Sequence, residues 1–342
     1  MRKGLITFGL FFFFLATTAF GQEKRYALYS VAFYNQENLF DTIHDEGKND
    51  YEYLPDGANQ WNAMKYKSKL HNMAEVISKL STDKLPMGPV IIGMAEVENK
   101  RVLEDLLKQP SLSERGYKYV HHEGRDQRGI DCALLYNPSM FTLTGSKLIP
   151  YTNKDGSIYD TRGFLVVSGT LADETIHVIV NHWPSRAATS PARERAGEQV
   201  RAIKDSLMNE NSAAKIIIMG DMNDDPMDKS LAVSLGAKRK QADVGQNELY
   251  NPWWDTLKKG HGTLLYQGKW NLFDQIIVSG NLLGSDRSSL KYFKNEIFNR
   301  DFMFQKEGKY KGYPKRTQAG GVWTNGYSDH LPTMIYLIKE VK

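Results

Sequence analysis

Short apolar runs separated by polar stretches recur along the chain and predict a protein rich in strands. Tyr29–Tyr34 alternates, as a strand does when one face packs on the core. Pro89–Met94 and Ile216–Met219 are continuously apolar, which is typical of strands buried on both faces. Further strands are predicted over Tyr117–His121, Ile130–Tyr136, Phe141–Ile149, Thr161–Thr170, Thr175–Val180, Thr263–Gln267, Trp270–Ser279 and Thr333–Ile338.

Helical periodicity is limited to a few stretches. An apolar stripe predicts a helix over Asn62–Leu80. Asn99 suits the N-cap of a helix over Lys100–Lys108, and Pro191 opens a helix that ends at Leu207. The chain contains no repeat, low-complexity tract or clear linker. Strands alternating with a few helices favour a single mixed α/β domain.

The first 21 residues have a different pattern from the rest. Arg2 and Lys3 precede an apolar segment from Leu5 to Ala16, and Ala19 and Gly21 are small, as positions before a cleavage point are. This predicts a signal peptide over residues 1–21 and a mature domain over residues 22–342, exported to the periplasm or secreted. An uncleaved membrane anchor is the alternative, although the apolar run is short for a span.

The amino-acid composition and net charge exclude few classes of function. The chain has 342 residues, 41% of them hydrophobic, and a formal net charge of +4, which falls to +2 without Arg2 and Lys3. A nearly neutral protein gives no global electrostatic argument for nucleic acid. The single cysteine, Cys132, lies in an apolar run and excludes an internal disulfide. No later stretch is long and apolar enough to span a bilayer.

Polar side chains with oxygen atoms follow three of the predicted strands. Asp221 and Asn223 stand two apart after Ile216–Met219, where Gly220 ends the apolar run. Asn35 and Glu37 repeat this arrangement, and Glu96 lies just beyond Pro89–Met94. Such oxygen ligands suit a hard cation, although an Asx-rich turn explains Asp221 and Asn223 alone equally well.

Histidines and further acids lie at other predicted strand ends. His182 follows Thr175–Val180, while Asp329 and His330 precede the last strand. Asp274 interrupts an otherwise apolar strand, so its carboxylate must be paired, hydrogen-bonded or bound to a metal. Each residue alone is weak evidence, because a lone histidine near a strand end is usually structural. The set together predicts one site.

The segments YNQENLFD, GMAEVEN, RGIDCALLY, NHWPSR, GDMNDDP and SDHLP resemble the ordered motifs of the endonuclease/exonuclease/phosphatase superfamily. That group includes deoxyribonuclease I, exodeoxyribonuclease III, inositol polyphosphate 5-phosphatases and bacterial sphingomyelinases. The resemblance extends from Asn35 to His330 and identifies the chain as an exported bacterial member. It implies a four-layer α/β/β/α sandwich of two packed mixed sheets and hydrolysis of phosphate esters with Mg²⁺ or Mn²⁺.

The resemblance also implies roles for single residues. Metal-site residues are Asn35, Glu37, Glu96 and Asp329, and Glu37 departs from the aspartate that the family often has. Catalytic residues are His182, Asp221, Asn223, Asp274 and His330. Asp221 would orient the attacking water, His330 would stabilise the phosphorane, and Asp274 would pair with a histidine whose identity the sequence leaves open.

Physical chemistry agrees with these roles. A metal and hydrogen-bond donors stabilise charge on the phosphoryl oxygens, and a carboxylate raises the pKa of a neighbouring histidine. Arg128 and Arg186 are candidates to hold phosphate bidentately, with solvated surface arginines as the alternative. Oxygen ligands also admit Ca²⁺.

Three functions remain open from the sequence. The first is an exported, monomeric, Mg²⁺-dependent phosphodiesterase such as a nuclease, with nucleic acid as the favoured substrate and no stable protein partner. The second is an inositol or phospholipid phosphatase, or a sphingomyelinase-like lipid phosphodiesterase. The third is a non-catalytic surface binding protein.

Specificity is expected in loops. Candidate loops are Asp41–Asn59, Asp225–Trp254 and Tyr292–Gly321, including the basic and aromatic segment Lys306–Arg316. That segment faces either substrate or solvent. Three alternatives are open for Trp253 and Trp254: stacking on bases, insertion into a lipid interface, or packing in the core.

Overall fold

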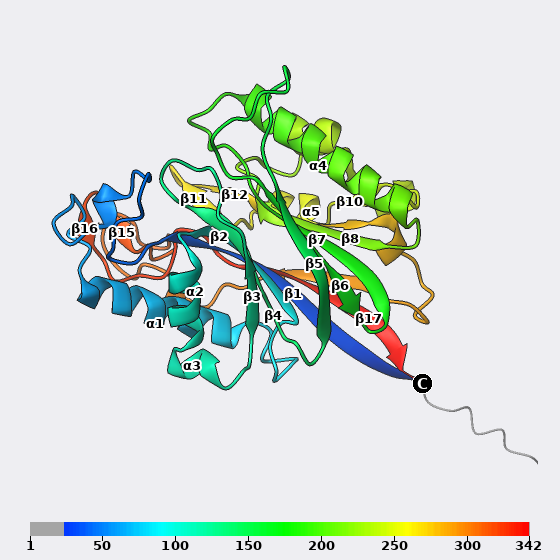
Figure 1. Ribbon diagram of the computed structural model, residues 1–342. Helices are drawn as coiled ribbons and strands as arrows, with labels where there is room; N and C mark the ends of the chain where they lie inside the picture. Colours follow the sequence, from blue (N-terminus) through cyan, green and yellow to red (C-terminus); the bar gives the residue numbers. More distant parts are fainter. Residues whose placement is uncertain (1–23, 342) are drawn as a thin grey trace, which may run out of the picture.

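The computed structural model describes residues 24–341, so the predicted signal peptide lies outside the described residues. Two mixed β-sheets pack face to face, and helices cover the outer face of each sheet (Figure 1). This is the predicted four-layer α/β/β/α sandwich, and the prediction of the fold is confirmed. In the described residues, no helix combines the length and the apolar character needed to cross a membrane.

The first sheet has the strand order β14-β17-β1-β2-β4-β3. Its central strands β1 and β2 are parallel, while β17 runs antiparallel to β1. The strands are β1 (Arg25–Leu39), β2 (Ile91–Val97), β3 (Lys118–His121), β4 (Asp131–Tyr136), β14 (Lys291–Ile297) and β17 (Thr333–Val341).

The second sheet has the order β5-β6-β7-β8-β13-β10-β9. Its central strands β7 and β8 are parallel, and β13 pairs antiparallel with β8. The strands are β5 (Phe141–Ile149), β6 (Phe164–Leu171), β7 (Glu174–His182), β8 (Lys215–Asp221), β9 (Ala237–Lys238), β10 (Leu249–Tyr250) and β13 (Asp274–Ser279).

Helices α1 (Ala63–Lys79), α2 (Lys100–Leu107) and α3 (Pro110–Ser113) lie on the first sheet, and α4 (Ser190–Glu210) lies on the second (Figure 1). Asn62 caps α1 and Asn99 caps α2, because each side chain accepts hydrogen bonds from two amides of the first turn. A π-helical segment (Ser230–Leu235) and α5 (Trp254–Lys258) follow β8. Two small hairpins join β11 (Leu264–Tyr266) to β12 (Lys269–Asn271), and β15 (Gln318–Ala319) to β16 (Val322–Trp323).

Alternation along the strands divides the core into three apolar layers. On β1, Val31 and Phe33 pack between the sheets, while Ala32 and Tyr34 pack under the helices of the first sheet. On β8, Ile217 packs between the sheets and Ile218 packs under α4. The continuously apolar runs are therefore strands buried on both faces, as predicted.

Three details differ from the sequence-based predictions. Trp270–Ser279 is not one strand: it breaks at Leu272 and Phe273 into β12 and β13, which belong to different sheets. The predicted loop Tyr292–Gly321 begins with the edge strand β14, which mixes polar and apolar residues because it is only partly buried. Gly220 continues β8 instead of ending it, and a Cβ there would lie 2.2 Å from the carbonyl oxygen of Asn181.

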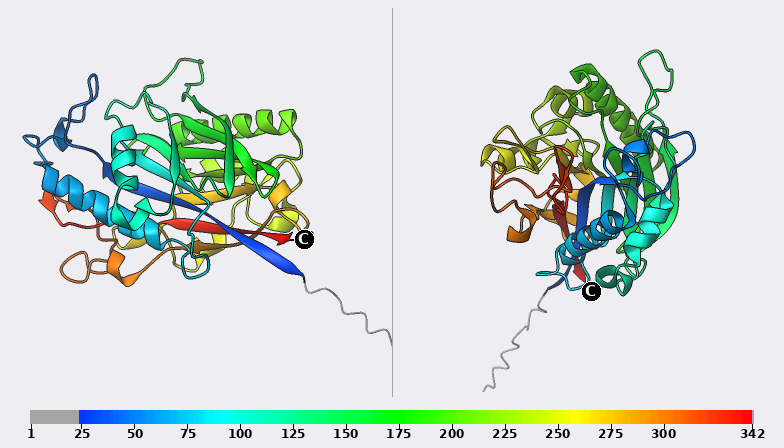
Figure 2. Two further views of the ribbon diagram at one scale, coloured as in Figure 1. Left: turned by 60° about the horizontal axis from the view of Figure 1, so that its bottom comes forward. Right: turned by 90° about the vertical axis from the view of Figure 1, so that its left-hand side faces the viewer.

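Cys132 and Trp253 are buried, and Trp253 donates a hydrogen bond through Nε1 to the carbonyl of Ile276. Trp253 therefore packs in the core. The carboxyl ends of β1, β2, β7 and β8 meet at one end of the sandwich, beside the first residues of β13 and β17. Figure 2 (right) looks onto this end, which loops from distant parts of the chain surround.

Candidate active site

Strand register brings three predicted site residues side by side. His182 pairs with Asp221 across the parallel strands β7 and β8, and Asp221 pairs with Asp274 across the antiparallel strands β8 and β13. All three are buried. Because they occupy paired positions at the same end of three neighbouring strands, strand pairing alone brings their side chains together.

The two sheets meet at the site through Asn35. Its Nδ2 donates to Oε1 of Glu96 over 3.2 Å and to Oδ2 of Asp221 over 3.1 Å. Glu96 has a left-handed backbone (φ 59°) at an irregularity in β2, and its Oε2 accepts the amide of Asn38 over 2.9 Å. An asparagine, a glutamate and an aspartate from three strands therefore form one cluster.

His182 completes this cluster. Its Nε2 lies 3.7 Å from Oε1 of Glu96 and 3.7 Å from Oδ2 of Asp221. Burial, followed by the positive charges of Arg162 and Arg128, holds the pKa of His182 well below its usual value. The imidazole is therefore neutral at pH 7 and can act as a ligand or an acceptor.

His330 is the histidine that meets Asp274. Its Nδ1 lies 2.7 Å from Oδ2 of Asp274, and its Nε2 lies 3.8 Å from Oδ2 of Asp221. Burial by itself would lower the pKa of His330, but Asp274 and Asp221 raise it well above its usual value. His330 is therefore an imidazolium whose Nε2–H points toward the acid cluster.

Asp221 lies between the two histidines. Burial raises the pKa of Asp221 to about 7, and the neighbouring Asp274 and Glu96 act in the same direction, while His330 and the amide of Asn223 oppose them. Its Oδ1 accepts the amide of Asn223 over 2.9 Å. A carboxyl with a pKa near neutrality can exchange a proton with a water under physiological conditions.

The cluster has the composition and spacing of a divalent-metal site. One donor atom each from Glu96, His182 and Asp221 lie within 4.8 Å of one another. Two carboxylates converge here, and the described residues place no lysine or arginine between them. A cation would offset that repulsion. The donors suit a divalent cation.

Glu37 and Asp329, predicted as metal ligands, both pair with Arg316, and Oδ1 of Asp329 also lies 3.9 Å from Nε2 of His330. Arg316 donates from Nε to Oε1 of Glu37 over 2.8 Å, and its Nη2 lies 2.9 Å from Oδ2 of Asp329. The other oxygen of Glu37 accepts the amide of Thr317. Burial, followed by the negative charge of Asp329, raises the pKa of Glu37 to about 7.

Asn223 and Arg186 have structural contacts. Nδ2 of Asn223 donates to the carbonyl of Trp183 over 3.0 Å. Arg186 donates to the carbonyl of Asn223 and to Asp228, and it stacks on Phe273 at 4.5 Å. Its charge is therefore compensated within the protein.

Arg128 is less occupied. Its side chain is half exposed, and its Nε lies 3.9 Å from Oδ1 of Asp126. It also contacts Asn38, whose amide donates to Glu96, which places Arg128 beside the site. Its hydrogen bond to Oδ1 of Asn38 is long, at 3.5 Å. Of the two arginines predicted to bind phosphate, Arg128 is the one free to do so.

Three cations near the site were not singled out from the sequence. They are Arg316, Arg162 and the fully buried Lys69. Lys69 donates to Oγ1 of Thr317 and to the carbonyl of Tyr327. Lys69 stands one turn before Met73 on the apolar face of α1, and a lysine on an apolar face indicates a buried charge that needs partners. Arg162 and Arg316 lie in a predicted strand and a basic loop, where an arginine is unremarkable.

A family model described as the Endonuclease/Exonuclease/phosphatase family matches residues 30–339. The chain has no match among curated proteins. Solved structures similar to it include D. rerio TDP2 complexed with a single-strand DNA product, with 13% identity, a TM-score of 0.54, and 91% of this chain and 99% of that chain covered.

Two further similar structures have different activities. The Bacteroides thetaiotaomicron mannosyl-6-phosphatase has 15% identity, a TM-score of 0.54, and coverage of 90% of this chain and 99% of its own. ANGEL2, a 2',3'-cyclic phosphatase, has 14% identity, a TM-score of 0.56, and coverage of 94% and 100%. At such identities the likeness shows the fold, and these proteins do not share one substrate.

Proposed function

The chain belongs to the endonuclease/exonuclease/phosphatase family, and we propose that it is a divalent-metal-dependent phosphoesterase that cleaves phosphodiesters of nucleic acid. The observation that carries this proposal is the buried cluster in which the Asp274–His330 pair, joined over 2.7 Å, faces Asp221 and Glu96. A binding module has no need for a protonated histidine, a carboxyl with a pKa near 7 and a metal-ligand set within one site.

The roles follow from position and charge. Glu96 would hold the metal, with Asn35 beside it orienting its carboxylate. When bound, a divalent cation withdraws negative charge from the phosphoryl oxygens. Asp274 keeps His330 protonated, so that His330 donates from Nε2 to a phosphoryl oxygen as negative charge develops there.

Asp221 would accept a proton from the attacking water, because its carboxylate lies between His182 and His330 at the centre of the cluster. The water oxygen then forms a bond to phosphorus, the ester P–O bond breaks, and the leaving alkoxide takes up a proton from solvent water, while Asp221 releases its own proton to solvent. His182, held neutral by burial, would orient the water or accompany Glu96 and Asp221 as a ligand.

The experiment compares substrates and variants on the purified chain without its first 21 residues. Plasmid DNA, a single-stranded oligonucleotide, bis-p-nitrophenyl phosphate, inositol phosphates and sphingomyelin are incubated with Mg²⁺ and with EDTA. Hydrolysis of DNA and of the chromogenic diester that EDTA abolishes is the expected result. His330→Ala should lose most turnover, while the exposed His71→Ala on α1 serves as the matched control.

Other outcomes would redirect the proposal. Turnover of monoesters or lipids alone would assign the protein to a phosphatase or lipid phosphodiesterase. If the folded protein hydrolyses none of these substrates, the binding-protein hypothesis remains. Metal binding has its own readout: Mn²⁺ should raise the melting temperature of the wild type and raise it much less for Glu96→Gln.

We also propose that residues 1–21 are removed on export and that residues 22–342 act as a monomer. The basic start, apolar segment and small residues before Gln22 support the removal of residues 1–21. Mass spectrometry of the mature protein from whole cells and their medium tests it. A retained Met1 together with membrane association would support an anchor instead.

A further inference from the structure

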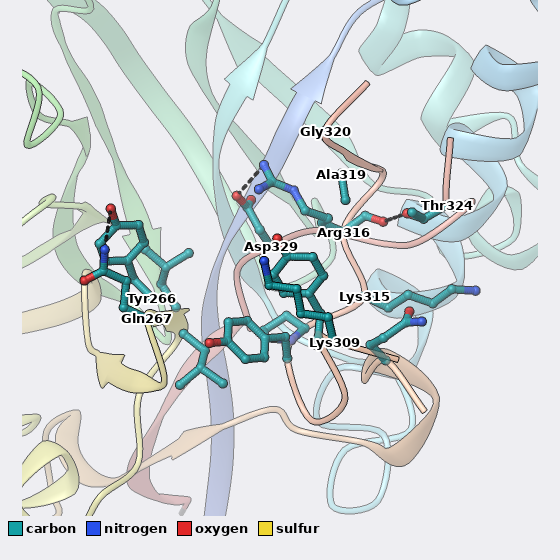
Figure 3. Close-up of a pocket in the computed structure, with 15 residues that line it drawn as sticks. Tyr266, Gln267, Lys309, Lys315, Arg316, Ala319, Gly320, Thr324 and Asp329 are labelled. Carbon is teal, nitrogen blue, oxygen red and sulfur yellow. Dashed lines mark hydrogen bonds and ion pairs between the residues drawn. The ribbon is translucent and has the colours of Figure 1, made fainter. Parts of the chain in front are cut away.

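A pocket of about 590 Å³ opens beside the proposed catalytic cluster (Figure 3). Its lining includes Arg316 and Asp329, which also belong to the site already described. The other lining residues come from the β11–β12 hairpin and from the loop that precedes β17. Its volume is within the usual range of small-ligand sites, about 300–1,000 Å³.

The hairpin wall is anchored directly to the catalytic histidine. Leu264 forms an isolated antiparallel bridge with His330, and the amide of Leu331 donates to the carbonyl of Thr263 over 2.9 Å. The position of β11 is therefore tied to the position of His330. A group held against this wall has a defined distance from the reacting phosphate.

The loop wall is joined to the hairpin at the rim. The Tyr313 hydroxyl accepts the amide of Gly268 over 2.7 Å, which connects the β11–β12 turn to the loop. Backbone hydrogen bonds between Gln305 and Tyr313, and between Lys315 and Met303, close the base of the loop. The predicted loop Lys306–Arg316 therefore faces a built pocket.

Aromatic rings and cations occupy the two walls. Tyr266 is 64% exposed on the hairpin and Tyr310 is 49% exposed on the loop. The centroid of the Tyr310 ring also lies 5.5 Å from Nζ of Lys309 and 5.6 Å from the ring centroid of Tyr313, so Tyr310 offers part of its surface while Tyr266 offers more. Lys309 and Lys315 also line the pocket, and in residues 24–341 neither lies within 4 Å of a carboxylate. In Figure 3, Tyr266 stands on one side of the pocket, and Lys309 and Lys315 stand on the other.

This combination favours one kind of ligand. Stacking on a tyrosine suits a planar base, and an uncompensated lysine suits a phosphate. A lipid interface needs a continuous exposed apolar patch, whereas this pocket also exposes polar side chains such as Gln267, Gln305 and Thr324. Two partly exposed tyrosines, with two lysines that form no ion pair in residues 24–341, fit successive nucleotides of a single strand better than a lipid interface.

We propose that this pocket is a nucleotide subsite, in which Tyr266 and Tyr310 stack on bases flanking the scissile phosphate and Lys309 and Lys315 contact the neighbouring phosphates. The inference rests on the proposed phosphoesterase function and names its substrate as single-stranded nucleic acid. Arg316, fixed by Glu37 and Asp329, lies between the subsite and the catalytic cluster.

Binding in EDTA separates this inference from catalysis. Fluorescence anisotropy of a short labelled oligothymidylate measures Kd without turnover. Tyr266→Ala and Tyr310→Ala should each raise Kd about tenfold. Tyr266→Phe should keep the wild-type Kd because it keeps the ring. Lys309→Ala and Lys315→Ala should each lower the slope of log Kd against log salt by about 0.7.

Matched controls lie at the opposite end of the sandwich. Tyr26→Ala, at the second residue of β1, and Lys118→Ala, at the start of β3, remove an exposed tyrosine and an exposed lysine. Both variants should leave Kd and its salt slope unchanged. Circular dichroism confirms that each variant is folded. Hydrolysis of bis-p-nitrophenyl phosphate, which carries no nucleotide beside its scissile phosphate, should keep its kcat in the pocket variants.

Three results would overturn the inference. One is pocket variants that bind the oligonucleotide like the controls. Another is a wild type that hydrolyses the chromogenic diester yet binds no oligonucleotide, which leaves the proposed function intact. The third is an inositol phosphate or an anionic lipid vesicle that binds with the same dependence on the tyrosines and lysines. Absence of all hydrolysis, with binding still sensitive to the variants, would refute the proposed function and leave the nucleotide subsite supported.

Discussion

Replacing Asp274 with asparagine removes one buried charge while nearly preserving the shape of the side chain. Asp274 is fully buried, its Oδ2 lies 2.7 Å from Nδ1 of His330, and its Oδ1 has no hydrogen-bond partner among the described residues. In the variant, the amide oxygen can still accept from Nδ1. The amide nitrogen then takes the place of Oδ1, which accepts no hydrogen bond among the described residues.

The expected loss follows from this geometry. Two unit charges 2.7 Å apart attract by about 6 kcal/mol at an effective dielectric constant of about 20, but desolvation offsets much of that energy. Hydrogen bonds to charged groups contribute a net of about 1.5–3 kcal/mol. If the charged form of His330 is needed in the transition state, Asp274→Asn should lower kcat/KM by about 10-fold to 100-fold.

The pH profile distinguishes catalysis from packing. Asp274 is the main group that raises the pKa of His330 against the effect of burial. Without its charge, that pKa falls, so activity that needs the imidazolium should disappear at lower pH than in the wild type. Protonated His330 also stabilises the fold below its unfolded pKa, and this contribution is lost as the pH rises through the folded pKa.

The assay is hydrolysis of bis-p-nitrophenyl phosphate with Mg²⁺ across the pH range, with thermal unfolding measured in parallel. Asp286→Asn, at an exposed aspartate near β14, is the control. A variant that keeps kcat/KM within twofold would refute the assignment of His330 as a charged catalyst. A loss of activity with an unshifted profile would mean that Asp274 only supports the local structure.

Three further predictions concern other parts of the molecule. Gly220→Ala should destabilise the protein by about 1–3 kcal/mol, because the new Cβ would meet the Asn181 backbone, and should depress activity by displacing Asp221; an unchanged melting temperature would contradict this. Burial, together with the negative charges of Asp41, Asp45 and Asp50, raises the pKa of Glu98 to about 9. The stability that the protonated Glu98 carboxyl contributes is therefore complete below the pKa of Glu98 in the unfolded chain, and it is lost as the pH rises through about 9. Glu98→Gln should therefore show a smaller fall in melting temperature between neutral and alkaline pH than the wild type, and equal falls would argue against a buried neutral Glu98. Arg128→Ala should raise KM for the chromogenic diester with little change in stability, whereas Arg186→Ala should mainly lower stability; the reverse pattern in steady-state kinetics and thermal melts would exchange their roles.

Most strands and the principal helices could be predicted from local periodicity. The predicted helix Asn62–Leu80 is observed as α1, capped by Asn62, and the apolar run Ile216–Met219 lies within β8. The edge strand β14 could not be predicted in this way, because a half-exposed strand does not need a regular apolar face. The break between β12 and β13 could not be predicted either, because the apolar pattern continues unchanged where the chain passes from one sheet to another.

Residue types that deliver oxygen and nitrogen ligands at strand ends are local properties, so the sequence by itself determined the family, the four-layer sandwich and the candidate set around Asp221. Pairings across the chain depend on tertiary structure. Asp274 and His330 are separated by 56 residues, and Glu37 and Arg316 by 279. Only the packing of the two sheets decided that His330 is the partner of Asp274, that Glu37 binds Arg316, and that a basic, aromatic loop forms a pocket beside the site. The sequence determines the chemistry of each side chain, whereas the distances between side chains that catalysis requires are set only when the chain has folded.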